Sequence, residues 1–117
     1  MHLLNNFLIF IIFKPQHFLV PQVPTSLKLI EAGNKDLTLS ASISEDDKQC
    51  NSTAIEFTCD DVTVSINVEL LKSEYVGKLT ELHPFMSYNC SAKVRNNAGI
   101  SESTDVAVFH TKQDGEL

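Results

Sequence analysis

The residues of this chain with the clearest chemical potential are its three cysteines, Cys50, Cys59 and Cys90. A thiol can bond a second thiol, bind a metal ion or attack an electrophile, and its surroundings decide which. The odd number leaves at least one cysteine free or bonded outside this chain. No two of them have the spacing of a zinc-ligand pair, and His83 and His110 fall in an expected turn and at an expected strand end. The cysteines therefore favour disulfide chemistry over a metal site.

Two asparagines match the acceptor pattern for N-linked carbohydrate. Asn51 opens an Asn-Ser-Thr triplet in a polar stretch typical of a surface loop. Asn89 opens an Asn-Cys-Ser triplet that lies within an expected strand and shares its middle residue with a disulfide candidate. We interpret Asn51 as the stronger glycosylation candidate and Asn89 as the weaker one, and such acceptors favour the secretory pathway.

Other kinds of chemistry lack the residues that they need. The acidic runs Glu45-Asp46-Asp47 and Asp60-Asp61 do not have the spaced oxygen ligands of a calcium loop. The sequence contains no nucleophile elbow or phosphate loop, and it has only four glycines. The formal charge is −6, and the nine Lys and Arg residues are scattered, which argues against binding to nucleic acid or to an anionic membrane surface. We therefore expect no enzyme activity, no cofactor and no small-molecule substrate.

The elements that would position these residues are short strands. Residues 88–94 alternate, with Tyr88, Cys90, Ala92 and Val94 on one face and polar side chains on the other. Residues 62–70 alternate in the same way, and shorter alternating or apolar runs cover 27–29, 37–43, 55–59, 75–82 and 106–111. No run has the 3.6-residue period of a helix. Seven short strands separated by turn residues predict an all-β, antiparallel sandwich.

A corner is expected just before residues 88–94. Leu79 and Leu82 supply two apolar anchors, and Pro84 cannot donate a backbone hydrogen bond, so a strand should end there. Tyr88 then begins the next strand, where it can bury its ring and return its hydroxyl to the backbone a few residues upstream. This arrangement is the tyrosine corner of Greek-key sandwiches.

The order of residues in this region resembles the second half of a fibronectin type III domain. The resemblance rests on the corner and the strand after it, on Asn97-Ala98-Gly99-x-Ser101-Glu102, and on a closing Val106-x-Val108-x-x-Thr111. It extends over roughly Val23 to Lys112 and implies a seven-stranded immunoglobulin-like sandwich. Such domains usually carry a tryptophan on the second strand, where this chain offers Ala41, and the chain has no tryptophan. We expect Phe57 to fill that part of the core.

A true immunoglobulin domain is the nearest rival, because Tyr-x-Cys also occurs on its sixth strand. It would need a partner cysteine on the second strand and a tryptophan on the third, and this chain has neither. The fibronectin type III register brings the inward end of the third strand, at Cys59, beside the start of the sixth, at Cys90. A disulfide between these two is expected, with Cys50 as the alternative partner of either. The alternative without a disulfide is that Cys90 is a small buried apolar residue.

Three segments are expected along the chain. Residues 1–20 are a signal-like or non-domain segment, with an apolar run that Lys14-Pro15 interrupts but with no basic residue ahead of it and no small-residue cleavage site. A misassigned start and a retained anchor are the alternatives. Residues 21–112 form the domain, and residues 113–117 form a tail.

The resemblance implies a non-catalytic, extracellular interaction or spacer module. Its partners would be proteins, and it would belong to a larger multidomain membrane protein at the cell surface, such as a receptor or adhesion protein. Receptor-type tyrosine-protein phosphatase ectodomains are one such class. An intracellular structural array domain and a truncated gene product are the alternatives. The expected contacts are the loops at residues 44–53 and 96–102, or an exposed edge of residues 62–70 or of the last strand.

Overall fold

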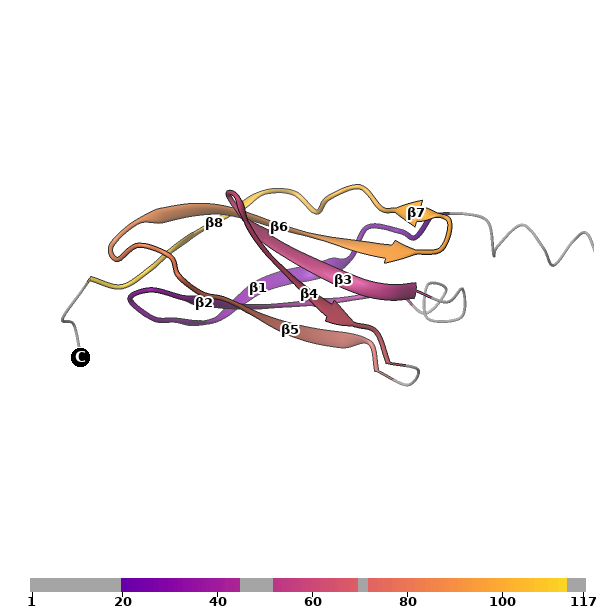
Figure 1. Ribbon diagram of the computed structural model, residues 1–117, viewed down its shortest axis with the longest axis horizontal. Coiled ribbons are helices and arrows are strands. Elements are labelled where there is room, and N and C mark those ends of the chain that lie inside the picture. The colour runs from indigo at the N-terminus through magenta and orange to yellow at the C-terminus, as the bar shows by residue number, and fades with distance from the viewer. Residues whose placement is uncertain (1–19, 45–51, 70–71, 114–117) are drawn as a thin grey trace, which may run out of the picture.

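The computed structural model describes residues 20–44, 52–69 and 72–113, and all of their regular structure is β-strand. Two antiparallel sheets face each other (Figure 1). One contains, in spatial order, β1 (Thr25–Ala32), β2 (Leu37–Ser42) and β5 (Glu74–Leu79). The other contains β4 (Val62–Asn67), β3 (Ser52–Cys59), β6 (Ser87–Asn96) and β7 (Gly99–Ile100), with β8 (Ala107–His110) also paired to β6. The predicted all-β sandwich is confirmed. The described residues include no helix long and apolar enough to cross a membrane.

The core lies between the sheets and is built from the alternating residues of the strands. The inward side chains of β2 and β3 are Leu37, Leu39, Ala41, Ile55, Phe57 and Cys59, and those of β5 and β6 include Tyr75, Leu79, Tyr88, Cys90, Ala92 and Val94. Leu27 and Leu29 of β1 and Val62, Val64 and Ile66 of β4 are partly buried against this core. Alternation along a strand sends successive side chains to opposite faces, which is why the sequence pattern located the inward residues of β2, β3, β4 and β6.

In the absence of a tryptophan, the largest buried side chains of the core are other aromatic residues. Phe57 and Tyr75 are the two largest fully buried residues among those described, and Ala41 of β2, which is paired with Tyr75, is also buried. Gly77 of β5 leaves room for the Phe57 ring: a Cβ atom at Gly77 would lie 2.5 Å from Phe57 Cδ2 and 3.1 Å from Val64 Cγ1. The expectation that Phe57 is a core residue is correct, and its ring packs against a glycine on the facing sheet.

Two predicted strands end earlier than the sequence pattern suggested. The strand expected to reach Leu82 ends at Leu79, because Glu81 has a φ of 61° and the Leu82 N–H turns to donate to Lys35 O at 2.9 Å. The strand expected over residues 62–70 ends at Asn67, although the Val68 N–H still donates to Thr53 O at 3.0 Å. Residue 70 lies outside the described residues.

The last predicted strand, at residues 106–111, is present as β8, and the predicted loop at residues 96–102 contains the additional short strand β7. Between them, the Ser101 Oγ accepts a hydrogen bond from the Val94 N–H at 2.9 Å, and the Thr104 Oγ1 accepts one from the Ala92 N–H at 3.0 Å. Side-chain hydroxyls thus replace backbone carbonyls as acceptors for β6. Because these bonds satisfy the β6 amides, regular strand pairing can stop here without leaving a buried N–H group that lacks an acceptor.

The two valines of this region face outward rather than into the core. Val106 is 64% exposed and Val108 is 54% exposed. The reason is the pairing of β8 with β6, which places Phe109 opposite the inward-facing Tyr88 and Val108 opposite the outward-facing Asn89. Phe109 is therefore the residue of β8 that packs against the core.

We predict that Gly77→Ala lowers the free energy of unfolding by about 1–3 kcal/mol, because the new methyl group must displace Phe57. Chemical denaturation measures this. Ser40→Ala, on the neighbouring strand β2, is the matched control: Ser40 is fully buried and its hydroxyl has no hydrogen-bond partner among the described residues. Removing that hydroxyl should be neutral or stabilising. Equal stability of Gly77→Ala and the unmodified chain would contradict the account of the core.

Candidate binding surfaces

The corner before β6 is fixed by Tyr88. Its hydroxyl accepts a hydrogen bond from the His83 backbone N–H at 2.7 Å, and its ring lies in the core. Leu82 is buried beneath the corner, and Pro84 is partly exposed. Tyr88, Leu82 and Pro84 thus lie together, and their arrangement holds the backbone in place without forming a reactive site.

Thr111 ties the end of the domain to the same corner, and its role was not foreseen from the sequence. Its hydroxyl donates to His83 O at 2.6 Å and accepts from the Met86 N–H at 3.0 Å. The Phe85 N–H donates to Lys112 O at 2.9 Å. Between these bonds, Phe85 has a φ of 53° and its side chain is 75% exposed. The corner therefore presents an aromatic ring to solvent on a tightly held backbone.

The structure joins Cys59 and Cys90 by a disulfide within one sheet. The two residues are paired directly across β3 and β6, with their Cα atoms 4.1 Å apart, and both are fully buried. The neighbouring Asp60 N–H donates to Asn89 O at 2.9 Å, so the cysteines occupy a non-hydrogen-bonded pair, where facing side chains are closest. Cys50, the alternative partner, lies outside the described residues.

Of the two glycosylation candidates, only Asn89 lies within the described residues. Asn89 lies on β6 with its side chain exposed, and its backbone N–H donates to Asp60 Oδ1 at 3.3 Å. Carbohydrate at Asn89 would project from the outer face of the sheet and leave the core unchanged. Asn51 lies outside the described residues, so its setting stays a prediction.

Groups that could have suggested catalysis have structural explanations. Asp60 has a φ of 53° in the two-residue turn between β3 and β4, which is a hairpin role. Ser87 Oγ and His110 Nδ1 form a hydrogen bond of 2.8 Å, but both side chains are exposed, and among the described residues no hydrogen bond joins the ring to a carboxylate. A nucleophile would need such an orienting group. Within residues 20–44, 52–69 and 72–113, no three potential metal ligands come together.

Tyr75 holds the connection between β4 and β5, and its contribution was missed in the sequence. Its hydroxyl lies 2.6 Å from Lys72 O and 3.0 Å from Glu69 O, and it accepts the Glu69 N–H at 2.9 Å. Lys72 Nζ lies 5.3 Å from the centre of the ring. The signal was present: a tyrosine in an inward position needs a partner for its hydroxyl.

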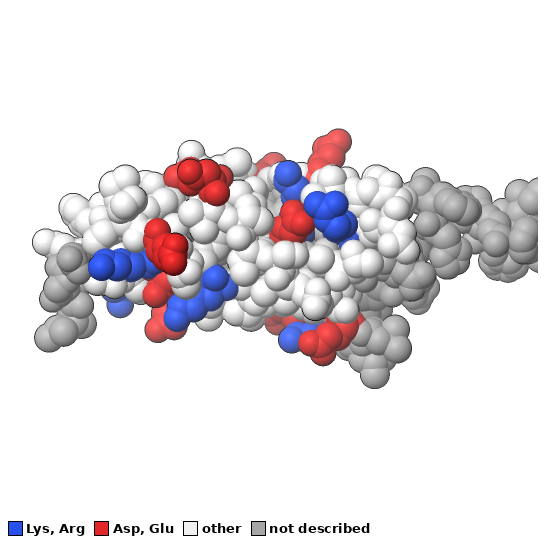
Figure 2. All heavy atoms as spheres, viewed as in Figure 1, with Lys and Arg blue, Asp and Glu red and all other residues white. Residues whose placement is uncertain are grey.

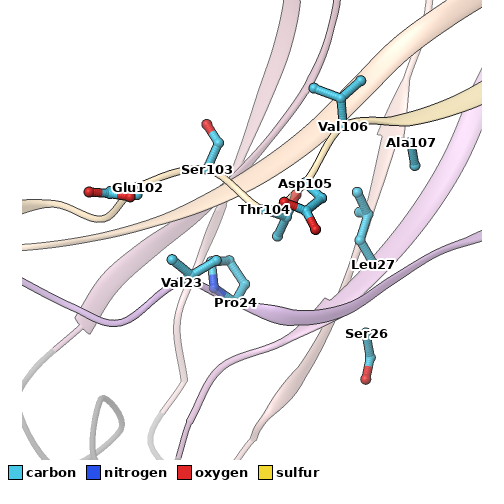
Figure 3. Close-up of a pocket in the computed structure, with 10 residues that line it drawn as sticks. All are labelled: Val23, Pro24, Ser26, Leu27, Glu102, Ser103, Thr104, Asp105, Val106 and Ala107. Atoms are coloured by element: carbon cyan, nitrogen blue, oxygen red, sulfur yellow. The ribbon is translucent and has the colours of Figure 1, made fainter.

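An open groove of about 670 Å³ separates the start of β1 from the segment between β7 and β8 (Figure 3). One side is formed by Val23, Pro24, Ser26 and Leu27, and the other by residues 102–107. Its lining mixes apolar side chains with the carboxylates of Glu102 and Asp105. The groove is an open, concave surface next to the predicted loop at residues 96–102.

Charges of both signs are interspersed on the face shown in Figure 2. Arg95 pairs with Glu56 across the outer face of one sheet, with 3.1 Å between Nη2 and Oε2. In the other sheet, Lys28 Nζ lies 3.8 Å from Glu74 Oε2. This face has no concentrated positive field of the kind that phosphate groups require.

We predict that Tyr88→Phe lowers the free energy of unfolding by about 1–2 kcal/mol, because the His83 amide loses its acceptor. Native-state hydrogen exchange should show faster exchange at the His83 amide. Tyr75→Phe is the matched comparison, since it also removes one buried phenol hydroxyl but should instead expose the Glu69 amide. Loss of protection at the same amide in both variants would contradict these assignments.

We also predict the cysteine pairing in the oxidised protein. Peptide mapping by mass spectrometry without reduction should find one peptide that joins Cys59 to Cys90, and a Cys50 that is not linked to either. Replacing both partners by alanine should cost about 2–4 kcal/mol of stability. A peptide that links Cys50 to Cys59 or to Cys90 would overturn this pairing.

No protein-family model matches the sequence, and no curated protein matches it. The structure is similar to the FN1–FN3 domains of chicken CNTN1, with a TM-score of 0.60 and 19% identity over 80% of this chain and 32% of that chain. It is similar to a myokine, with a TM-score of 0.58 and 18% identity over 80% and 99% of the two chains. It is also similar to FN3tt, with a TM-score of 0.58 and 21% identity over 81% and 98%.

These similarities, together with the strand order, the tyrosine corner and the fully buried residues between the sheets, concern the fold. The chain has a fibronectin type III-like fold.

Proposed function

We propose that this chain is a non-catalytic module that binds another protein or spaces neighbouring domains, and that it works outside the cell in a receptor or adhesion protein. The observation that carries the proposal is the buried disulfide between Cys59 and Cys90 within a fibronectin type III-like sandwich. Disulfides of this kind persist in oxidising compartments and are rare in the cytosol.

The use of the polar side chains supports a role without catalysis. The hydroxyls of Tyr75, Tyr88 and Thr111 are engaged with backbone groups, and those of Ser101 and Thr104 satisfy amides of β6. These hydroxyl groups thus maintain the fold. The accessible parts of the domain are its loops, its strand edges and an open groove. Surfaces of this kind are suited to binding another protein.

The wider setting forms the finer part of the proposal. We take residues 21–112 as the domain and place it in a larger multidomain membrane protein, of which receptor-type tyrosine phosphatases are one class. The similarity to FN1–FN3 domains of CNTN1 is compatible with a module that stands beside others of its kind. An intracellular structural array would be a different setting for the same fold.

Expression of the full chain, with its own N-terminus, in cultured mammalian cells tests the extracellular setting. We expect secreted protein with an oxidised Cys59–Cys90 pair and N-linked carbohydrate that peptide N-glycosidase removes. Asn51→Gln should abolish most of the resulting mass shift. Asn97→Gln is the matched control, because Asn97 is followed by Ala-Gly and is not an acceptor.

The intracellular alternative makes the opposite prediction. It requires that the chain stays inside the cell, with free thiols at Cys59 and Cys90 and no carbohydrate. That result would refute the extracellular proposal.

A further inference from the structure

Most edges of the sandwich carry features that discourage pairing with another strand. The pairing of β1 with β2 shifts register twice, and Ser26 in β1 has a φ of 59°. On β5, Glu74 and Lys78 are exposed charges. The β7 and β8 side of the other sheet is discontinuous, with strands of two and four residues. Irregularity, charge and shortness are the usual means by which an edge is protected.

The fourth edge, β4, has none of these features. Its six residues pair with β3 without a register shift. The run from Val62 to Val68 contains no charged residue, glycine or proline, and most of its residues are β-branched. It is therefore a regular, uncharged edge that can accept a further strand.

The backbone groups available on this edge follow from the ladder. The Val68 N–H donates to Thr53 O on β3, and in an antiparallel ladder alternate residues point the same way. Val64 and Ile66 thus point their backbone groups toward β3, and Thr63, Ser65 and Asn67 point theirs outward. In the described part of the chain, no hydrogen bond joins these outward backbone groups to another strand.

Charge distinguishes between the partners that could occupy this edge. A second copy, paired antiparallel about Ser65, would place Thr63 opposite Asn67 and Asp61 opposite Glu69 at both ends. Like charges directly opposite each other oppose pairing, and each chain carries a formal charge of −6. Shifting the register avoids the contact of Asp61 with Glu69, but it leaves an outward residue facing a turn. The edge is thus poorly suited to its own copy.

We propose that the outer edge of β4 binds an extended segment of a partner protein, with uncharged, β-branched residues at its centre and Lys or Arg at both ends. The exposed carboxylates of Asp61 and Glu69 bracket the edge and would meet those basic ends. Eight residue steps separate them, or about 27 Å along a strand, so the segment is about nine residues long. This inference rests on the proposed function, since it specifies the partner of the interaction module.

A synthetic peptide provides the probe: nine residues that alternate threonine and valine, with a lysine at each end. Titration into the full chain, followed by amide NMR, should shift the Thr63, Ser65 and Asn67 signals. The matched peptide with glutamate at each end should bind at least about tenfold more weakly. Raising the salt concentration should reduce the difference in affinity between the two peptides. Equal binding of the two peptides, or shifts confined to the groove or to residues 96–102, would overturn the proposal.

Variants of β4 distinguish the contribution of backbone pairing to peptide binding from the contribution of the carboxylates. Ser65→Pro removes an outward N–H that the β3–β4 ladder does not use, so the fold should persist while binding is lost. Ser65→Thr is the matched control and should bind normally. If Ser65→Pro unfolds the chain, Glu69→Lys with Asp61→Lys serves instead and should reverse the preference toward the glutamate-ended peptide. A retained preference would refute the assigned role of the carboxylates.

Two outcomes separate this inference from the proposal on which it rests. If the lysine-ended peptide does not bind but the secreted chain carries its disulfide and carbohydrate, the edge proposal fails and the extracellular module stands. If the chain dimerises without peptide and Ser65→Pro abolishes the dimer, a second copy occupies the edge and the basic partner is wrong.

Discussion

The sandwich depends on the strict alternation of β6, which lies at the centre of one sheet and directs its apolar side chains toward the other. Its inward side chains at positions 88, 90, 92 and 94 form much of the core, and its backbone pairs with β3 on one side and with β7 and β8 on the other. Because side chains alternate, a slip of one residue would turn every apolar group outward and every polar group inward. The Tyr88 hydrogen bond at one end and the Cys59–Cys90 disulfide beside it oppose such a slip.

Much of the fold was predictable because its main signal is local. A period of two identifies a strand from its own residues, and this located the inward faces of β2, β3, β4 and β6. The boundaries of the strands were less predictable, because they depend on contacts between distant segments. The strand before the corner ends at Leu79 because of a turn at Glu81 and a bond to Lys35, and neither feature has a distinctive sequence.

The outward direction of Val106 and Val108 illustrates the same limit. Two valines separated by one residue indicate a strand but do not say which face is buried. The face is set by the pairing of Tyr88 with Phe109, which brings together residues from two strands. The core also depends on contacts between distant segments. Nothing in the sequence distinguishes Gly77, and the need for a glycine there follows from its close contact with Phe57. At the candidate surfaces, the sequence located the cysteines and the edge strand, while the groove and the identity of the backbone groups that bind the Tyr75 hydroxyl required coordinates.

The hydroxyl bonds of Ser101 and Thr104 to β6 constrain how this region can change over evolutionary time. Irregular connections usually tolerate insertions and deletions. Here the two hydroxyls accept hydrogen bonds from two alternate amides of β6. Adding or removing one residue between Ser101 and Thr104 would therefore break at least one of these two hydrogen bonds. The segment between β7 and β8 should therefore keep a constant length while its other side chains vary, in the manner of a strand.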